Sequence, residues 1–302
     1  MNGARELLAE MLAVRMPERT RDWLRTAEEE IGRSAAAERF CRLISLASRN
    51  VSKSPLAPRA EEVAAARQAS EGWNPERWDL LEATRVALVL ARRDLEEPTA
   101  SQAIEEAFRF ADAGELGALY KSLQFLPAQE RFAWRGGEGC RSSLRTVFEA
   151  AACDTGFPAR NFPAPAWRQL VIKALFVEAP LWRVYGLDSR LDPELARMAL
   201  DLADERRSAK RQVQPELWLC LGTHGGERGM ASIERELARA NTLGRRAAAI
   251  ALARAGGLDR LRELLAQEHE PSVGRTMREA LEGRVQQTAF RDLDPKELNT
   301  KR

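Results

Sequence analysis

An all-α fold is the fold class that this 302-residue chain predicts, on three observations. Leucine, alanine, arginine and glutamate dominate, whereas glycine and β-branched residues are sparse, and this composition favours helices over strands. Apolar residues recur at helical spacing along most of the chain. Prolines and glycines divide this pattern into short segments, which predicts a multi-helical right-handed array or an α-solenoid-like stack of antiparallel helix pairs.

The first third of the chain predicts a series of short helices. Residues 4–15 have an apolar face, and the pattern from Trp23 to Ala47 fits either one helix or two, with a break near Gly32. The stretch Asn50–Pro58 holds two prolines and small polar residues, so we expect a linker there. A short helix is predicted over Glu61–Ala69.

A helix cap is the main signal in the next part of the chain. Asn74-Pro75-Glu76 places a capping residue before a proline in the first turn, and the helix that follows is expected to end near Leu95. Trp73 and Trp78 are expected to pack at its start. Arg135–Gly139 contains three glycines, which predicts the most flexible loop of the first half.

The C-terminal part predicts helix pairs. Thr223–Gly226 reads as a loop, and after it a short pattern recurs one helical hairpin later: Arg246, Ala251 and Leu252 return as Arg275, Ala280 and Leu281. Stacked antiparallel pairs of this kind resemble HEAT-type repeats, although any helical hairpin gives the same pattern. We therefore expect a HEAT-like segment over residues 226–287 and a loose charged tail over residues 288–302.

Composition argues against several kinds of partner. The formal charge is only +2, with 47 basic and 45 acidic residues mixed along the chain, so no nucleic-acid partner is indicated. The longest apolar runs, such as Val86–Ala91, are too short to span a bilayer, and we expect a cytoplasmic protein without a transmembrane segment.

Metal and cofactor chemistry also find no support in the sequence. His224 and His269 lack carboxylate or cysteine neighbours at ligand spacing, which argues against a metal site. The four cysteines have no zinc-site spacing and are expected to be reduced and mostly buried. No P-loop, G-x-G-x-x-G or G-x-S-x-G motif occurs, so we expect no cofactor.

The predicted site begins on a helix expected over Arg141–Ala152. At about 100 degrees per residue, Arg141, Arg145 and Glu149 line one flank a turn apart and can face a common cleft. A solvated flank of ion pairs, each contributing about 0.2 to 1 kcal/mol, explains the same spacing. Both interpretations stay open for this helix.

A second predicted helix, Trp167–Val177, carries the central residue of the hypothesis. Its apolar residues cover almost the whole circumference, which is typical of a helix enclosed by others, and only Gln169 and Lys173 interrupt the interior-facing surface. A lysine there must reach solvent, pair with a carboxylate or lose its proton, and pairing with Glu149, or second with Asp188, is expected. Lys173 is then either a structural brace or a ligand-binding group.

Aromatic residues surround the same region. Trp167 and Trp182 are candidate walls of a small-molecule site, although aromatic residues at helical spacing also form cores. The complete set of ligand-binding candidates is Arg141, Arg145, Glu149, Trp167, Gln169, Lys173, Trp182, Asp188 and Arg190. No catalytic residue is assigned.

Several blocks in a fixed order resemble the EboA-type metabolite-traffic proteins. The likeness covers about Trp73–Trp218, and it rests on Arg141 through Val147-Phe148-Glu149-Ala150, Trp167 with Gln169 and Lys173-Ala174-Leu175-Phe176, Gly186-Leu187-Asp188 with Arg190, and Pro215-Glu216-Leu217-Trp218, with Tyr120-Lys121-Ser122-Leu123 and Leu126-Pro127 upstream. Ser143 and Arg168 stand where the family pattern has asparagine. If those asparagines bind a ligand, this chain is expected to bind a different one or none.

The resemblance implies a helical cytoplasmic protein that helps to move a metabolite precursor toward export, in a family with no established reaction. On this basis residues 1–225 are expected to form the EboA-like domain, with the HEAT-like segment packed on it. We predict a non-catalytic protein that binds a small metabolite, or a protein of its biosynthetic or export pathway. The sequence does not set the oligomeric state.

Two alternatives stay open. One is an enzyme of the same pathway that uses Lys173 and Glu149, because a desolvated lysine serves as a base or a Schiff-base nucleophile. The other is a protein–protein interaction scaffold built on the C-terminal helix pairs.

Overall fold

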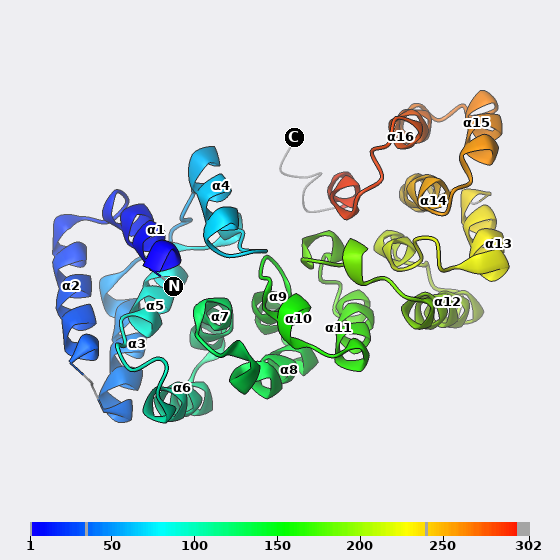
Figure 1. Cartoon of the computed structure of the whole chain (residues 1–302). Helices are drawn as coiled ribbons and strands as arrows, with labels where there is room; N and C mark the ends of the chain where they lie inside the picture. The colour runs from blue at the N-terminus through cyan, green and yellow to red at the C-terminus, as the bar shows by residue number, and fades with distance from the viewer. Residues whose placement is uncertain (1, 34–35, 239–240, 295–302) are drawn as a thin grey trace. The chain divides into compact units, whose positions relative to one another are not determined.

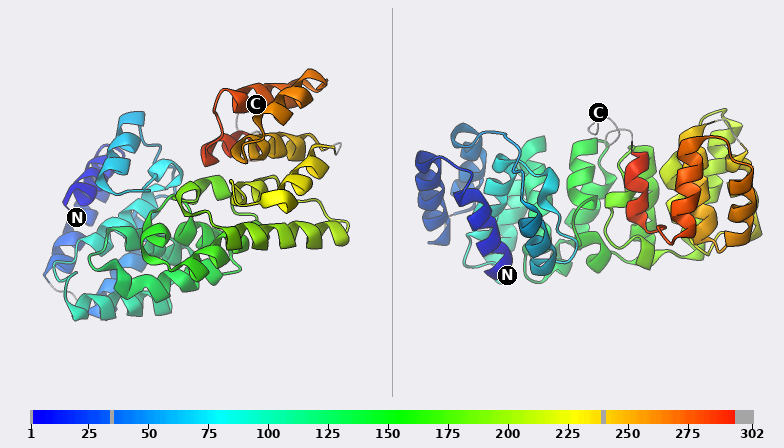
Figure 2. Two further views of the ribbon diagram at one scale, coloured as in Figure 1. Left: turned by 45° about the vertical axis from the view of Figure 1, so that its right-hand side comes forward. Right: turned by 90° about the horizontal axis from the view of Figure 1, so that it is seen from above.

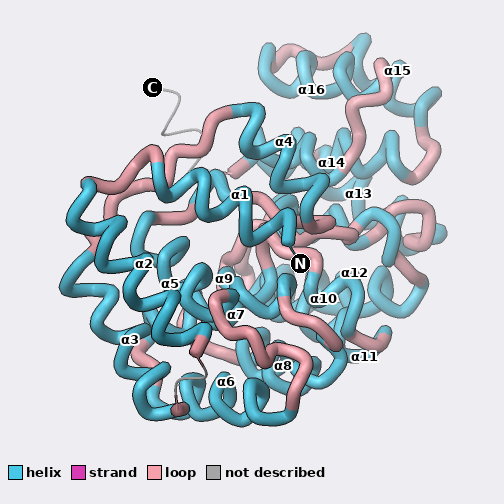
Figure 3. The backbone as a smooth tube through the Cα atoms, turned by 60° about the vertical axis from the view of Figure 1, so that its left-hand side comes forward, coloured by secondary structure: helices cyan, strands magenta, loops and turns pink. Residues whose placement is uncertain are grey.

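Every regular element of the described chain is a helix. The computed structural model describes residues 2–33, 36–238 and 241–294 (Figure 1), and over these ranges it contains sixteen α-helices and seven 3-10 helices. Across the same ranges there is no strand, apart from an isolated bridge between Pro55 and Asp79, and the tube of Figure 3 shows only helices and loops. The prediction of an all-α fold is confirmed, whereas its finer description as a solenoid or HEAT-like stack stays a prediction.

The chain divides into two compact units. Unit 1 is Met1–Trp167 and unit 2 is Arg168–Arg302, so the division falls within α11 (Ala164–Phe176). The boundary expected at residue 225 follows the resemblance rather than compactness, and it stays a prediction.

One apolar helix forms the centre of unit 1. Nearly every side chain of α5 (Leu80–Leu90) is buried, as its almost uninterrupted apolar sequence predicts. Four helices pack directly on it: α1 (Asn2–Ala13), α2 (Glu18–Gly32), α3 (Ala37–Asn50) and α7 (Ala113–Ser122). The region from Trp23 to Ala47 thus forms two helices, and residues 34–35 between them lie outside the described ranges.

The remaining elements of unit 1 are shorter. Its other α-helices are α4 (Ala60–Ala69), α6 (Pro98–Phe110), α8 (Ala133–Arg141), α9 (Arg145–Ala152) and α10 (Phe157–Asn161), and its 3-10 helices are η1 (Pro75–Arg77), η2 (Leu123–Phe125) and η3 (Gln129–Phe132). Helix α6 packs along α3, and the two lie together in Figure 1.

The helix predicted from Asn74 to near Leu95 is divided in two and ends at Leu90. Asn74 caps only the short η1, where its Oδ1 accepts from the Glu76 N–H at 3.2 Å. The cap of α5 is Asp79, whose Oδ1 accepts from the Glu82 N–H at 2.7 Å, while the Glu82 carboxylate accepts from the Asp79 N–H at 3.1 Å. This reciprocal capping box starts the longer helix.

The prediction of a glycine-rich loop over Arg135–Gly139 is wrong, because these residues lie within α8. A Cβ added at Gly136 would lie 2.4 Å from the Phe157 ring, and one at Gly139 would lie 2.7 Å from both the Ala151 methyl and the Tyr120 ring. The glycines therefore permit close packing of α8 rather than a flexible backbone. Sequence alone does not separate these two uses of glycine.

The predicted packing of Trp73 and Trp78 is confirmed, and the two rings contact each other. Their ring centroids lie 5.8 Å apart, and Phe125 meets Trp73 edge-to-face at 4.9 Å. All three rings are buried. The cluster joins η1 to η2 within the core of unit 1.

Unit 2 is built around α14 (Thr242–Arg254), whose residues 247–252 are all buried. It packs on α13 (Gly226–Leu237), on α15 (Leu258–Ala266), on α16 (Pro271–Leu281) and on η6 (Pro215–Cys220), and these helices are the yellow-to-red part of Figure 2. The other elements are α12 (Pro193–Ser208), η4 (Leu181–Arg183), η5 (Asp188–Arg190) and η7 (Gln287–Leu293).

The prediction of a loose tail from residue 288 is wrong for residues 288–293. Residues 288–293 belong to η7, in which Phe290 and Leu293 are buried. These two side chains anchor the 3-10 helix, and α14 and η4 pack against it. Residues 295–302 lie outside the described ranges.

Candidate functional site

The predicted site residues are distributed over both units. Unit 1 holds Arg141, Arg145, Glu149 and Trp167, and unit 2 holds Gln169, Lys173, Trp182, Asp188 and Arg190. The expected pairing of Lys173 with Glu149 joins residues of different units, and it stays a prediction. The contacts of these residues within each unit are defined.

The helix predicted over Arg141–Ala152 is interrupted, which separates Arg141 from its supposed neighbours. Helix α8 ends at Arg141, the Ser142 Oγ accepts from the Leu144 N–H at 3.1 Å, and α9 begins only at Arg145. Arg141 pairs with Glu138 on α8 instead. Its predicted alignment with Arg145 and Glu149 is therefore wrong.

The second half of that alignment is confirmed. The Arg145 Nε donates to the Glu149 Oε1 at 2.6 Å, one turn apart on α9. The two side chains are 32% and 19% exposed, so water screens this pair in part. A pair of this kind contributes about 0.3 to 0.5 kcal/mol and indicates a helix flank by itself.

Helix α11 is less enclosed than its sequence predicts. Leu170, Val171, Ala174 and Leu175 are buried, but Gln169 and Phe176 are exposed. The expectation that Gln169 faces the interior is wrong. One apolar face, rather than the whole circumference, carries the packing of this helix.

Lys173 is half-buried on the same helix. Within the described residues of unit 2 its ammonium group has no ion pair and no hydrogen bond. The side chain has a long apolar stem, which allows it to remain charged at the edge of the packed face. Within unit 2, Lys173 is therefore available to bind a ligand.

Asp188 is not the partner of Lys173, and this second choice is wrong. Its Oδ1 accepts from Arg254 Nη2 at 2.7 Å, and its Oδ2 accepts from the Gln287 N–H at 2.9 Å. The Gln287 amide in turn donates to the carbonyl oxygens of Trp182 and Val184 at 3.0 and 2.9 Å. These bonds fasten η5 and η4 to η7, a structural role that local spacing does not reveal.

The remaining predicted site residues, Trp167, Trp182 and Arg190, are buried or half-buried in the fold. Trp167 and Trp182 are buried, and the Trp182 Nε1 donates to Asp294 at 3.3 Å. The Arg291 guanidinium lies 5.5 Å from the centre of the Trp182 ring. Arg190 is half-buried, and burial lowers the pKa of its guanidinium. Trp182 is thus a core residue of unit 2.

A pocket that the sequence did not indicate lies in unit 1, between α3 and α6. This α3–α6 pocket has a volume of about 560 Å³, and its main polar residues are Arg92, Arg93, Asp94, Glu97, Gln102 and Glu106. The residues come from the loop after α5 and from α6, and the N-terminal turn of α3 completes the wall. Small-molecule sites in proteins have volumes of about 300 to 1,000 Å³.

The loop of this pocket is fixed by a buried ion pair. Arg92 is almost fully buried and donates to both carboxylate oxygens of Asp94, from Nε at 2.9 Å and from Nη2 at 2.7 Å. The Thr99 hydroxyl donates to the same carboxylate at 3.0 Å, which ties the loop to the first turn of α6. Planar, two-point pairing of this kind gives a rigid wall.

Arg93 is the open cation of the α3–α6 pocket. It is exposed, and within the described residues it has no ion pair and no hydrogen bond. Glu97 and Glu106 line the same pocket, so charges of both signs converge there. The consecutive arginines directly after the apolar run of α5 are the sequence signal for this site.

Neither a metal cluster nor a membrane-spanning helix is found among the described residues. Among the residues that the structure describes, no group of three or more histidine, cysteine, aspartate or glutamate side chains is arranged to hold a metal ion. None of the described helices combines the length and the apolar character needed to cross a membrane.

Most of the cysteines are buried and all four are reduced. Cys140, Cys153 and Cys220 are buried and Cys41 is half-buried, as predicted. Burial raises the pKa of the Cys140 and Cys220 thiols to about 12, so these thiols stay protonated and unreactive.

The fold and its sites define a multi-helical protein with polar pockets between packed helices. A family model described as metabolite traffic protein EboA matches residues 4–222, which is most of the chain, and the chain belongs to this family. The resemblance found in the sequence is thereby confirmed and extended toward the N-terminus. Comparisons with curated proteins and with solved structures gave no match.

Proposed function

We propose that this protein assists the traffic of a small metabolite by binding it without chemical change. The observation that carries the proposal is the membership of the EboA family over residues 4–222. The α3–α6 pocket lies within that range and supports the binding role.

The lining of the pocket favours a polar ligand. Arg93 offers planar N–H donors to a carboxylate, phosphate or carbonyl group, and Glu97 and Glu106 offer acceptors to hydroxyl or amino groups. Arg92 is held by Asp94 and serves as a wall rather than as a contact. A compact metabolite with several oxygen or nitrogen functions fits this arrangement.

We also propose a separate binding contact within unit 2, at Lys173. A half-buried ammonium without a partner in its own unit gains a charge-assisted hydrogen bond when an anionic or carbonyl group binds. Two other predicted candidates of unit 2, the exposed Gln169 and the half-buried Arg190, belong to the same proposal.

The experiment compares where the metabolite accumulates. The gene is deleted in the native organism, and small molecules inside and outside the cells are profiled by mass spectrometry. We expect the deletion strain to retain a precursor and to release less product, and the wild-type gene to restore export. An unchanged distribution in the deletion strain would contradict a role in traffic.

Two complementing variants locate the site. Arg93→Gln removes the open cation of the α3–α6 pocket and should fail to restore export. Arg49→Gln removes an exposed arginine on α3 that does not line the pocket, and it should restore export fully. Equal complementation by both variants would remove the pocket from the proposal.

The predicted HEAT-like segment, residues 226–287, gives a second candidate function, the binding of a pathway protein. It is favoured by the packing of α13 to α16, in which consecutive helices contact one another and α14 also contacts α16. Pull-down of proteins from the native organism by wild-type protein and by a chain lacking residues 226–302 tests it, after circular dichroism shows that the shortened chain is folded. Retention of every partner by that chain would exclude this function.

A further inference from the structure

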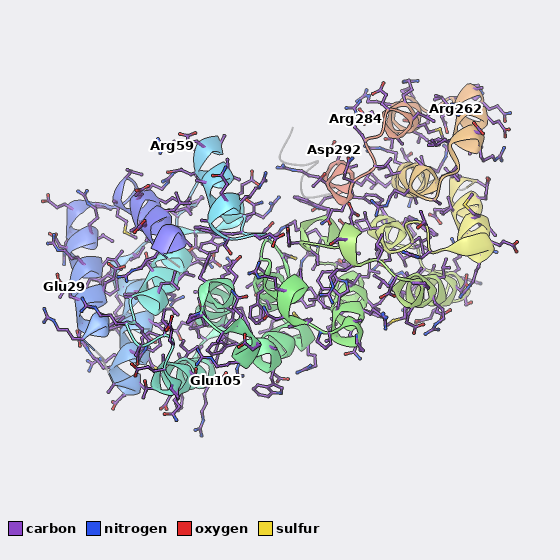
Figure 4. All side chains as sticks on the ribbon, viewed as in Figure 1. Glu29, Arg59, Glu105, Arg262, Arg284 and Asp292 are labelled. Carbon is purple, nitrogen blue, oxygen red and sulfur yellow. The ribbon has the colours of Figure 1, made fainter. Side chains whose placement is uncertain are left out.

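A second polar pocket lies in unit 2, outside the residues that match the family. It has a volume of about 190 Å³ and is formed by α14, α16, the turn after α16 and η7, hence the name α14–η7 pocket. Its polar lining includes Arg246, Thr276, Glu279, Arg284 and Asp292. Figure 4 labels Arg284, just after α16, and Asp292, on η7.

Arg246 is the unusual residue of this pocket. Its Nε donates to the Thr276 hydroxyl at 2.9 Å, and that hydroxyl donates to the Ser272 carbonyl at 3.1 Å. Within the described residues the two Nη groups have no hydrogen bond, and no carboxylate lies within ion-pair distance. A half-buried guanidinium is therefore oriented at one end and open at the other.

Burial makes this open cation costly. Loss of water around Arg246 lowers the pKa of its guanidinium, an effect that the carboxylates of Asp292 and Glu279 oppose only in part. Buried charges in proteins are ordinarily paired. Arg284, by contrast, contacts Glu282 at 2.9 Å and Glu279 at 3.5 Å. Arg246 is thus the cation of the pocket that lacks a carboxylate partner.

The free fork of a guanidinium matches a carboxylate in shape and charge, because two parallel N–H groups meet two oxygens. The pocket also contains Glu279 and Asp292, which repel a plain anion and attract an ammonium group. A volume of 190 Å³ corresponds to roughly six water molecules at about 30 Å³ each, which limits the ligand to a few heavy atoms.

We infer that the α14–η7 pocket binds a small amino acid-like zwitterion. Its carboxylate lies on the Nη groups of Arg246, and its ammonium group faces Glu279 and Asp292. This site is independent of the α3–α6 pocket and of the proposed role in traffic.

Calorimetric titration of the purified full-length protein tests the inference. The probes are glycine, β-alanine and 4-aminobutyrate, which differ in the spacing of their charges, together with acetate, ethylammonium and inorganic phosphate. We expect saturable one-to-one binding of at least one zwitterion. Acetate and ethylammonium, which carry one charge each, should bind more weakly than that zwitterion.

Two arginine variants assign the binding to the pocket. Arg246→Gln should weaken zwitterion binding at least about tenfold, since it removes a charge-assisted, two-point contact. Arg278→Gln is the matched control: it removes an exposed arginine of α16 with the same change of charge, outside the pocket, and should leave the dissociation constant within about twofold. Circular dichroism and the thermal midpoint establish that both variants are folded.

Three outcomes overturn the inference. One is the absence of saturable binding by all three zwitterions. The second is equal affinity of wild-type protein and the Arg246→Gln variant. The third is tighter binding of phosphate or acetate than of every zwitterion, which would make the pocket a simple anion site.

Discussion

The two pockets each contain an arginine of low exposure, but its surroundings differ. In the α3–α6 pocket the Asp94 carboxylate accepts two hydrogen bonds from Arg92 and a third from the Thr99 hydroxyl. In the α14–η7 pocket Arg246 bonds only a hydroxyl through Nε. The first arginine is part of the fold, because it is almost fully buried and a carboxylate of the chain holds it at two points. The second is open to an external carboxylate, so its removal should affect binding more than stability.

The largest effect on stability should come from breaking the pair at Arg92. Asp94→Ala leaves the almost fully buried guanidinium without its carboxylate, and such a loss costs about 3 to 5 kcal/mol in the free energy of unfolding. Urea denaturation at pH 7 measures it. Asp22→Ala is the control, since Asp22 and its partner Arg25 are both exposed, and a change below about 1 kcal/mol is expected. A similar small change for Asp94→Ala would show that Arg92 is not a brace.

A second buried pair in unit 1 should show the same behaviour with a defined pH dependence. Arg15 donates to both oxygens of Glu62, at 3.0 and 2.5 Å, and this hydrogen bonding lowers the pKa of Glu62 to about 2. Because the folded-state pKa lies below the unfolded value of about 4.5, the stabilisation is complete above that value and is lost as the pH falls toward 2.

Glu62→Gln should therefore cost about 2 to 3 kcal/mol at pH 7, and the difference from wild type should shrink steadily between pH 4.5 and pH 2. Unfolding by urea at a series of pH values gives the curve. Glu61→Gln, at the exposed neighbouring position, should remain within about 1 kcal/mol throughout. A pH-independent difference for Glu62→Gln would contradict the depressed pKa.

The helices are easier to predict from the sequence than the contacts between side chains of different segments that hold the helices together. Helical spacing placed α1 and α4 nearly where they lie, because this signal is local. The sequence placed Gly136 and Gly139 in a loop, because the ring and methyl groups that require them belong to other segments. Asp188 was assigned to Lys173 for the same reason, since its actual partners, Arg254 and Gln287, follow far along the chain.

The α3–α6 pocket was missed because a pocket depends on how elements pack. The local signal, two arginines after an apolar helix, does not distinguish Arg92, which is braced, from Arg93, which is open. Only the position of Asp94 separates them. Even a partner two residues away does not show from sequence which of the two arginines it binds, so the fold is needed to separate them.

Lys173 should behave as an open cation rather than as a brace. Lys173→Met retains most of the apolar stem, and no ion pair within unit 2 is broken, so the free energy of unfolding should change by less than about 1 kcal/mol. Metabolite export in the deletion strain should nevertheless fail to recover. Loss of several kcal/mol, as for Asp94→Ala, would instead identify Lys173 as part of a buried pair.

The smallest effect on stability is expected at Arg246, and it completes the contrast with Arg92. Arg246→Met removes a half-buried guanidinium whose loss of water is not offset by a carboxylate partner. The methionine side chain fills part of the space with apolar atoms. The lost bond to the Thr276 hydroxyl opposes this gain, so the free energy of unfolding should change by no more than about 0.5 kcal/mol. Urea denaturation at pH 7 measures the change beside Asp94→Ala. A cost of several kcal/mol would mean that the protein itself uses the Arg246 cation, and the two arginines would then have the same role.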